Sequence, residues 1–218
     1  MPVNSADYQR SKAIETVTWR ELPLGKGVAF SLLEEQSPTG RQASGQRLMD
    51  ILNGAAGLPQ CKLVVANRAQ AHRTRAGRLE QKTYGYYKVA WERGEPVRAT
   101  IRIYNLTAMR QQVLAPKVFL ETLLHEWVHH YDFTGLRLDR SPHTSGFFAR
   151  IRYVAETLGV GFVTPPKRDE SGRPLPPQGP PSRVRQRPVT TAAHTEPEGP
   201  APSWIREQIE ALLGRRPR

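Results

Sequence analysis

The sequence predicts an α+β fold in which helices surround a small antiparallel or mixed sheet, because strand-like and helix-like runs occupy separate parts of the chain. Apolar and polar residues alternate from Val97 to Asn105, as in a strand with one buried face. Between Ala115 and Phe133 apolar residues recur at helical spacing. The composition changes after Val163, so the folded domain is expected to span residues 1–163.

The elements are expected in the order helix, strands, helix, helix. The part of the chain through Gly40 has mixed patterning and indicates no clear element. Residues 42–53 are predicted to be helical, with Gly54 and Gly57 ending the helix and Pro59 preventing its continuation.

Strand signals follow this helix. Residues 62–66 form a short apolar run with β-branched members, and residues 83–91 are rich in aromatic side chains and valine. A turn over residues 92–96 separates that run from residues 97–105. The pattern predicts a hairpin immediately before the next helix.

Two helices complete the domain. The first opens near Pro116, since proline is tolerated in a first helical turn, and ends before Gly135. The second runs from Ser145 or Gly146 to Thr157, and Gly159 follows its end.

The C-terminal part has a different character. Residues 164–202 are rich in proline, arginine, glycine, serine and threonine, so they are predicted to be a disordered basic linker, either a plain spacer or a binding arm. Residues 203–214 are predicted to form a short amphipathic helix. Because helices this short are marginal alone, it should dock on its own domain or on a protein partner.

Composition limits the classes of partner. A net charge of +12 and a pI near 10.3 would attract nucleic acid, although a basic surface that serves solubility explains the same numbers. The single cysteine, Cys61, excludes an internal disulfide framework and a cysteine-based zinc ribbon. No apolar run is long enough for a membrane span, and a soluble cytoplasmic protein is expected.

The segment His125-Glu126-Trp127-Val128-His129 is an H-E-x-x-H motif inside the first of the two predicted helices. Residues four apart lie on one helical face, so His125 and His129 can reach one Zn²⁺ ion. Glu126 lies beside the first ligand and is placed to act as general base on water.

A catalytic zinc ion needs a third protein ligand. The favoured candidate is His143, at the start of the following helix, and the competitors are Asp132, Asp139 and Glu156. His130 points about 100 degrees away from His129 around the helix, so a surface or core role is favoured. Roles in supporting a ligand or an oxyanion stay open for His130 and Tyr131.

With these residues in place, residues 61–158 resemble the SprT-like family of minimal zincin metallopeptidases. The resemblance is carried by the strand 99–105, the helix 120–129, the third histidine His143 and the aromatic Phe147 four residues later. It implies a zincin-like minimal metallopeptidase fold, zinc held by His125, His129 and His143, and Glu126 as base and proton shuttle.

The resemblance also implies a protein or peptide substrate. In zincins the substrate adds its backbone to the edge strand before the motif helix, and here that strand would be Val97 to Asn105. Some relatives cleave proteins crosslinked to DNA. Two other functions stay open: a nucleic-acid- or partner-binding protein on a zincin scaffold, and a metal-dependent hydrolase of a non-peptide bond.

Overall fold

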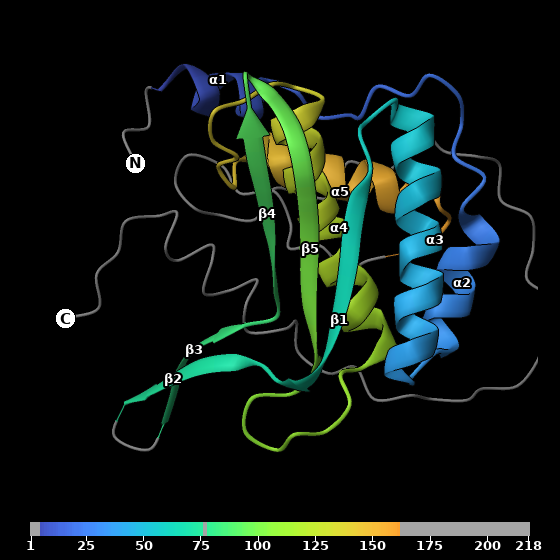
Figure 1. Cartoon of the computed structure of the whole chain (residues 1–218), viewed down its shortest axis with the longest axis vertical. Helices are drawn as coiled ribbons and strands as arrows, with labels where there is room; N and C mark the ends of the chain where they lie inside the picture. Colours follow the sequence, from blue (N-terminus) through green and yellow to red (C-terminus); the bar gives the residue numbers. More distant parts are fainter. Residues whose placement is uncertain (1–4, 76–77, 162–218) are drawn as a thin grey trace, which may run out of the picture. The chain divides into compact units, whose positions relative to one another are not determined.

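The computed structural model describes residues 5–75 and 78–161, which form a mixed α+β fold with a layer of helices behind a sheet (Figure 1). Its helices are α1 (Ala6–Ala13), α2 (Lys26–Glu34), α3 (Pro38–Ala56), α4 (Pro116–Thr134) and α5 (Ser145–Thr157). Its strands are β1 (Cys61–Ala69), β2 (Ala71–Arg75), β3 (Arg78–Thr83), β4 (Gly85–Glu92) and β5 (Glu95–Leu106).

The predicted helices α4 and α5 are confirmed, and Gly135 is the C-cap of α4. Helix α3 is longer than predicted at both ends. It begins at Pro38, because the Ser37 hydroxyl accepts a hydrogen bond from the Gly40 N–H at 3.0 Å. It passes through Gly54 and ends at Gly57, whose φ of 65° is the left-handed conformation that glycine adopts easily.

Three elements, α1, α2 and the β2–β3 hairpin, have no clear signal in the sequence. Helix α1 is capped by the Ser5 hydroxyl. Strands β2 and β3 pair only with each other and project from the end of the sheet where β1 finishes and β4 begins (Figure 1).

The main sheet has the strand order β1-β5-β4, with β5 parallel to β1 and antiparallel to β4. The expectation that residues 97–105 form an edge strand is therefore wrong. Strand β5 lies in the middle of the sheet and pairs on both sides over most of its length, so it is not an edge that an added peptide could join. The alternation in its sequence arises because one face of the sheet is buried, which is equally true of a central strand.

Two glutamine side chains from α3 cover the outer edge of β1. Gln46 accepts from the Leu63 N–H at 2.7 Å and donates to the Cys61 carbonyl at 3.0 Å. Gln42 accepts from the Val65 N–H at 2.8 Å and donates to the Leu63 carbonyl at 2.9 Å. These amides pair with the β1 backbone as a neighbouring strand would, which leaves β4 as the open edge of the described sheet.

The register of β4 fixes which of its backbone groups face outward. The Tyr104 N–H donates to the Tyr84 carbonyl at 2.9 Å, so the residues two, four and six positions further along β4, which are Tyr86, Lys88 and Ala90, also bond to β5. The residues between them, Tyr87 and Val89, direct their N–H and carbonyl groups to the open edge.

Helix α4 lies at the centre of the helical layer and is buried along most of its length. It packs on β4 and β5, while α3 packs on β1; α2 and α5 pack against α4, and α1 packs on α5. The core joins the inner sheet face to these helices and includes Leu48, Leu63, Ile101, Ile103, Phe119, Leu123, Leu124 and Trp127.

The predicted linker 164–202 and the predicted helix 203–214 lie outside the described residues. Among the helices that are described, none is long and apolar enough to cross a membrane.

Candidate metal centre

Three imidazoles meet at one point between α4 and α5. The Nε2 atom of His143 lies 3.1 Å from that of His125 and 3.0 Å from that of His129. In tetrahedral zinc sites with Zn–N bonds of about 2.0–2.1 Å, ligand nitrogens lie about 3.3 Å apart. The three side chains that the sequence singled out therefore have nearly the separation that such an ion requires.

The start of α5 brings His143 to the other two histidines. Thr144 is the N-cap of this helix, and its hydroxyl accepts from the Phe147 N–H at 3.1 Å. The same hydroxyl lies 2.9 Å from the Ser11 hydroxyl of α1. At Gly146 a Cβ atom would overlap the Ser11 carbonyl, so this close packing of α5 on α1 requires glycine.

Phe147 forms an apolar wall behind the cluster. Its ring centroid lies 5.0, 4.7 and 4.8 Å from those of His125, His129 and His143. It is fully buried, so it restricts the imidazoles to a narrow range of orientations. The aromatic residue in the family resemblance thus contacts all three histidines.

A chain of hydrogen bonds behind His129 fixes its tautomer. The Ser141 hydroxyl donates to Asp132 Oδ2 at 2.8 Å and lies 2.7 Å from His129 Nδ1. A hydroxyl has one proton, so Ser141 must accept from the His129 Nδ1–H. The lone pair of His129 is then on Nε2, where a metal ion would use it.

Asp132 is held in turn by Arg150. The guanidinium donates to Asp132 Oδ2 at 2.9 Å, and both side chains are fully buried. Burial raises the pKa of the Asp132 carboxyl, and the neighbouring Arg150 charge and the Ser141 hydrogen bond oppose that rise. Arg150 also donates to the backbone carbonyls of Ser11 and Ile14, which ties the network to the end of α1.

The electrostatics of the cluster suit a cation. Burial lowers the pKa of all three imidazoles, that of His143 to about 4, and the neighbouring histidines lower that of His125 further. The rings are therefore neutral at neutral pH and can use their lone pairs for a metal. The three histidines fit zinc in number, donor type and spacing.

Glu126 lies next to this cluster on α4 and is buried. Its carboxylate accepts a hydrogen bond from the Tyr87 N–H, one of the groups on the open edge of β4. Burial raises the pKa of this carboxyl to about 8, and the Tyr87 bond opposes the rise. A cation held by the histidines would lower it and favour the ionised form that a base requires.

The other candidates do not join the three histidines. Asp132 supports Ser141, Asp139 lies on the loop after α4, and Glu156 is exposed on α5. His130 is fully buried in the core, where its ring bonds to the Tyr87 hydroxyl at 3.1 Å and the Pro59 carbonyl at 3.0 Å. The Tyr131 hydroxyl accepts from the Thr18 N–H.

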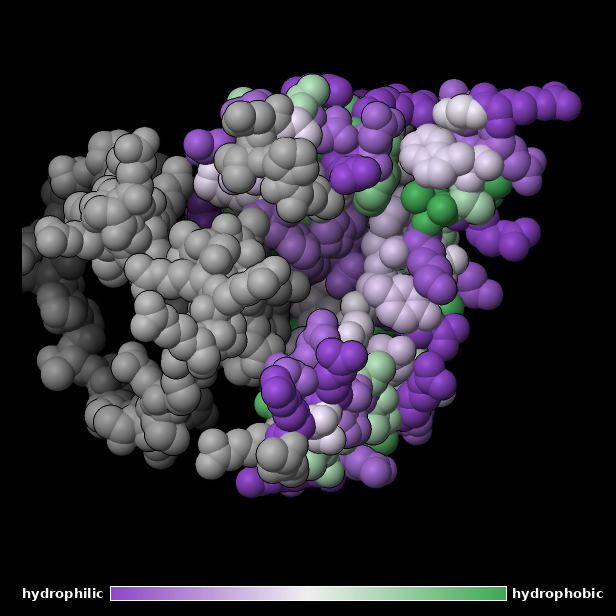
Figure 2. Space-filling view, turned by 90° about the vertical axis from the view of Figure 1, so that its left-hand side faces the viewer, coloured by the Kyte–Doolittle hydropathy of each residue, from purple (hydrophilic) through white to green (hydrophobic). Residues whose placement is uncertain are grey.

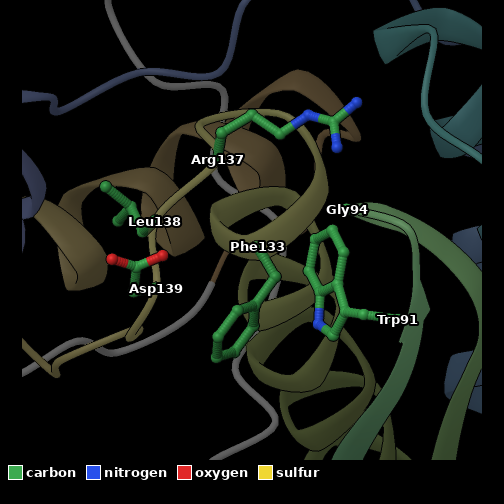
Figure 3. Close-up of a pocket in the computed structure, with 6 residues that line it drawn as sticks. All are labelled: Trp91, Gly94, Phe133, Arg137, Leu138 and Asp139. Carbon is green, nitrogen blue, oxygen red and sulfur yellow. The ribbon is translucent and has the colours of Figure 1, made fainter.

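A pocket of about 400 Å³ opens at the end of α4, one helical turn beyond His129. Trp91 reaches into it from β4 and Phe133 from α4, Gly94 borders it from the turn between β4 and β5, and the loop after α4 supplies the rest of the lining (Figure 3). The Phe133 ring also stacks on Tyr87, with centroids 5.7 Å apart. The lining consists of Trp91, Gly94, Phe133, Arg137, Leu138 and Asp139.

Comparison with known proteins found no matching family model, no matching curated protein and no matching solved structure. The functional assignment therefore rests on the residues and their geometry.

Sequence reasoning missed the roles of Ser141, Arg150 and the Tyr87 N–H. Ser141 and Arg150 contact the site only through tertiary packing, and their spacing from the motif has no periodic signal. The sequence offered one signal for this network, which is Asp132, a carboxylate three residues after His129. Its position is as compatible with a metal ligand as with a residue that orients a ligand through hydrogen bonds.

Proposed function

We propose that this protein is a zinc-dependent metallopeptidase of the SprT-like, zincin type. The observation that carries the proposal is the convergence of three imidazole Nε2 atoms beside Glu126, at the open edge of a sheet. A metal site, a base and a place to align an extended backbone thus occur together. The substrate class would be a protein or peptide in extended conformation.

Zinc, when bound, would lower the pKa of a water molecule to about 7 and polarise the scissile carbonyl. His125, His129 and His143 would hold the ion, with His129 oriented by Ser141. Glu126 would remove a proton from the attacking water and deliver it to the leaving amine. Its bond to the Tyr87 N–H keeps the carboxylate facing the edge of β4.

Strand β4 would align the substrate, in place of β5. A peptide added to the open edge would bond to the Tyr87 carbonyl and the Val89 N–H, which the register directs outward. The pocket between Trp91 and Phe133 lies further along the same strand and could receive an apolar or aromatic side chain of the peptide.

The direct test is Glu126→Gln, which keeps the size of the side chain and removes its basicity. We expect stoichiometric zinc in this variant and a loss of about 10²-fold or more in the rate of cleavage of an unfolded protein such as denatured casein. Zinc content by atomic absorption and cleavage by gel analysis measure the two effects. Equal cleavage by both proteins would overturn the proposed mechanism.

The alternative function is a binding protein on the same scaffold. It predicts zinc without cleavage of any protein substrate, and salt-sensitive binding of a partner that is unchanged in Glu126→Gln. Hydrolysis of a non-peptide bond that Glu126→Gln abolishes would instead keep the water chemistry and change the substrate class.

A further inference from the structure

The outer face of the main sheet is opposite the helical layer (Figure 1), and the side chains that point to it include five cations. Alternate residues of the three strands point to this face. We call it the basic face, and it is defined by Lys62, Arg68, Lys88, Arg98 and Arg102. No residue in 61–69, 85–91 or 96–106 is acidic; the two acids of these strands, Glu92 and Glu95, face each other at the turn between β4 and β5, and Glu95 pairs with Arg137.

The side chains of these five cations are accessible from solvent. Four of them are exposed, Arg102 is half-buried, and none forms an ion pair with another described residue. Where the sheet is seen from its β4 edge, long hydrophilic side chains project along the right-hand margin, with paler aromatic rings between them (Figure 2). Like charges held close together repel one another, which favours a polyanionic partner.

Tyrosines are interleaved with the cations. Tyr86 and Tyr104 lie edge to face with centroids 6.5 Å apart. The Lys88 ammonium lies 5.0 Å from the Tyr86 ring centre, and the Arg68 guanidinium lies 5.3 Å from that of Tyr104. Aromatic rings beside cations bind single-stranded nucleic acid, because bases stack on the rings while phosphates meet the charges.

The β2–β3 hairpin extends the same charge. Every residue of β2 is exposed, so this arm gains little from burial, and an isolated two-stranded ribbon is marginally stable in water. Residues 71–83 contain four lysine or arginine residues and one acid, Glu80. A projecting basic ribbon of this kind gains stability when it contacts a polyanion.

We infer that the basic face and the β2–β3 arm bind a single-stranded nucleic acid, with bases stacked at Tyr86 and phosphates held by the surrounding cations. This inference goes beyond the proposed peptidase function and does not depend on it, since the basic face is on the opposite side of the sheet from the helices that position the three histidines. It assigns a location to the attraction that the net charge of +12 predicts.

The test is fluorescence anisotropy of a labelled oligothymidylate with the full chain across a salt series. The variant Lys88→Glu/Arg98→Glu changes two exposed cations of the basic face. Its matched control is Lys12→Glu/Arg47→Glu, which makes the same change in net charge at exposed positions of α1 and α3. The basic segment 164–202 is identical in both, so its contribution cancels in the comparison.

We expect the basic-face variant to bind about tenfold more weakly or worse, and the slope of log K against log salt to fall by about 0.7 for each phosphate that the variant no longer neutralises. The control should weaken binding less than about threefold. Equal losses of affinity in the two variants would overturn the inference, because they would show attraction by net charge alone. Wild-type affinity in the basic-face variant would overturn it as well.

A second variant tests stacking. Tyr86→Leu keeps the charge, so we expect a loss of affinity for oligothymidylate of about threefold or more, with an unchanged salt slope.

Duplex DNA and anionic lipid vesicles are the comparison ligands. Tighter binding to either than to the single strand, or full affinity in Tyr86→Leu, would contradict a single-strand site. Glu126→Gln should bind the oligonucleotide as tightly as the wild type does. Oligonucleotide binding can therefore be established or refuted whether or not the protein cleaves peptides.

Discussion

At the scale of single residues, the best-defined feature of the site is the series of hydrogen bonds from His129 through Ser141 and Asp132 to Arg150. The histidine Nδ1–H needs an acceptor so that Nε2 can face a metal ion. Ser141 supplies that acceptor because its own proton is committed to Asp132. Asp132 in turn is compensated by a buried arginine, which avoids an isolated charge in the core.

We therefore predict that Ser141→Ala lowers zinc affinity by about 10- to 100-fold, because His129 loses the bond that sets its tautomer. Competition with a chromophoric chelator measures the dissociation constant. The control is Ser31→Ala, which removes an exposed hydroxyl that bonds to the Gly27 carbonyl on α2 and should leave zinc affinity unchanged. Unchanged affinity in Ser141→Ala would show that His129 needs no such support.

His130 leads to a separate prediction on pH. Burial lowers its pKa from 6.5 to about 4, so below pH 6.5 the unfolded chain takes up a proton that the folded chain does not. The contribution of neutral His130 to the free energy of unfolding is therefore fully present above pH 6.5, and it is lost as the pH falls toward 4. In the metal-free protein, the destabilisation caused by His130→Asn should shrink by roughly 2 kcal/mol between about pH 7.5 and pH 5.0.

Urea unfolding of the wild type and His130→Asn at the two pH values measures that difference. The other histidines are present in both proteins, so their titration cancels. A cost of substitution that stays constant with pH would mean that His130 is not buried in its neutral form.

At the scale of elements, strand β4 connects the fold to the proposed reaction. The side chains of Gln42 and Gln46 cover the opposite edge of the sheet, so an extended peptide has one open edge of the described sheet to join. That edge passes Glu126, since the Tyr87 N–H bonds to its carboxylate.

Proline substitutions in β4 separate substrate alignment from folding. Val89 directs its N–H outward, so Val89→Pro should keep the β4–β5 ladder and lower kcat/KM for an unfolded protein substrate by about tenfold, the value of roughly one hydrogen bond. Lys88 directs its N–H toward β5, so Lys88→Pro should lower the melting temperature instead. Thermal unfolding and initial rates measure both. Undiminished kcat/KM in Val89→Pro would exclude β4 as the substrate strand.

The motif helix and α5 could be predicted from the sequence because their signals are local: proline at the start of α4, glycine after the end of each and an apolar stripe between. The order of strands could not. Alternation along β5 reports that one face is covered, and it is the same for a central or an edge strand. The β2–β3 arm was missed because it buries no apolar face and so has no hydrophobic pattern.

The same distinction applies to the site. His125, His129 and Glu126 follow from spacing on one helix, and His143 could be named as a candidate because few ligands lie downstream. Ser141 acts through an arrangement set by the packing of α5 on α1, which depends on Gly146 and Ser11. That packing joins residues far apart in the chain, and a single sequence does not show it.

At the scale of the whole molecule, the described sheet has two faces with different chemistry. Its inner face packs on α3 and α4 and supports the three histidines, while its outer face presents the five cations of the basic face and the half-buried Tyr86. The β4 edge lies between them. A substrate on β4 and a nucleic acid on the basic face could therefore be bound together, because they occupy different surfaces of one sheet.

We propose that the three histidines hold one zinc ion, and X-ray absorption at the zinc K-edge of the purified full chain reports the ligands of that ion without reference to activity. We predict one equivalent of zinc with three imidazole nitrogens at about 2.0–2.1 Å and one further oxygen ligand. In His143→Ala the count of imidazole ligands should fall to two. A wild-type spectrum without bound zinc, or one in which His143→Ala leaves the coordination unchanged, would contradict the account.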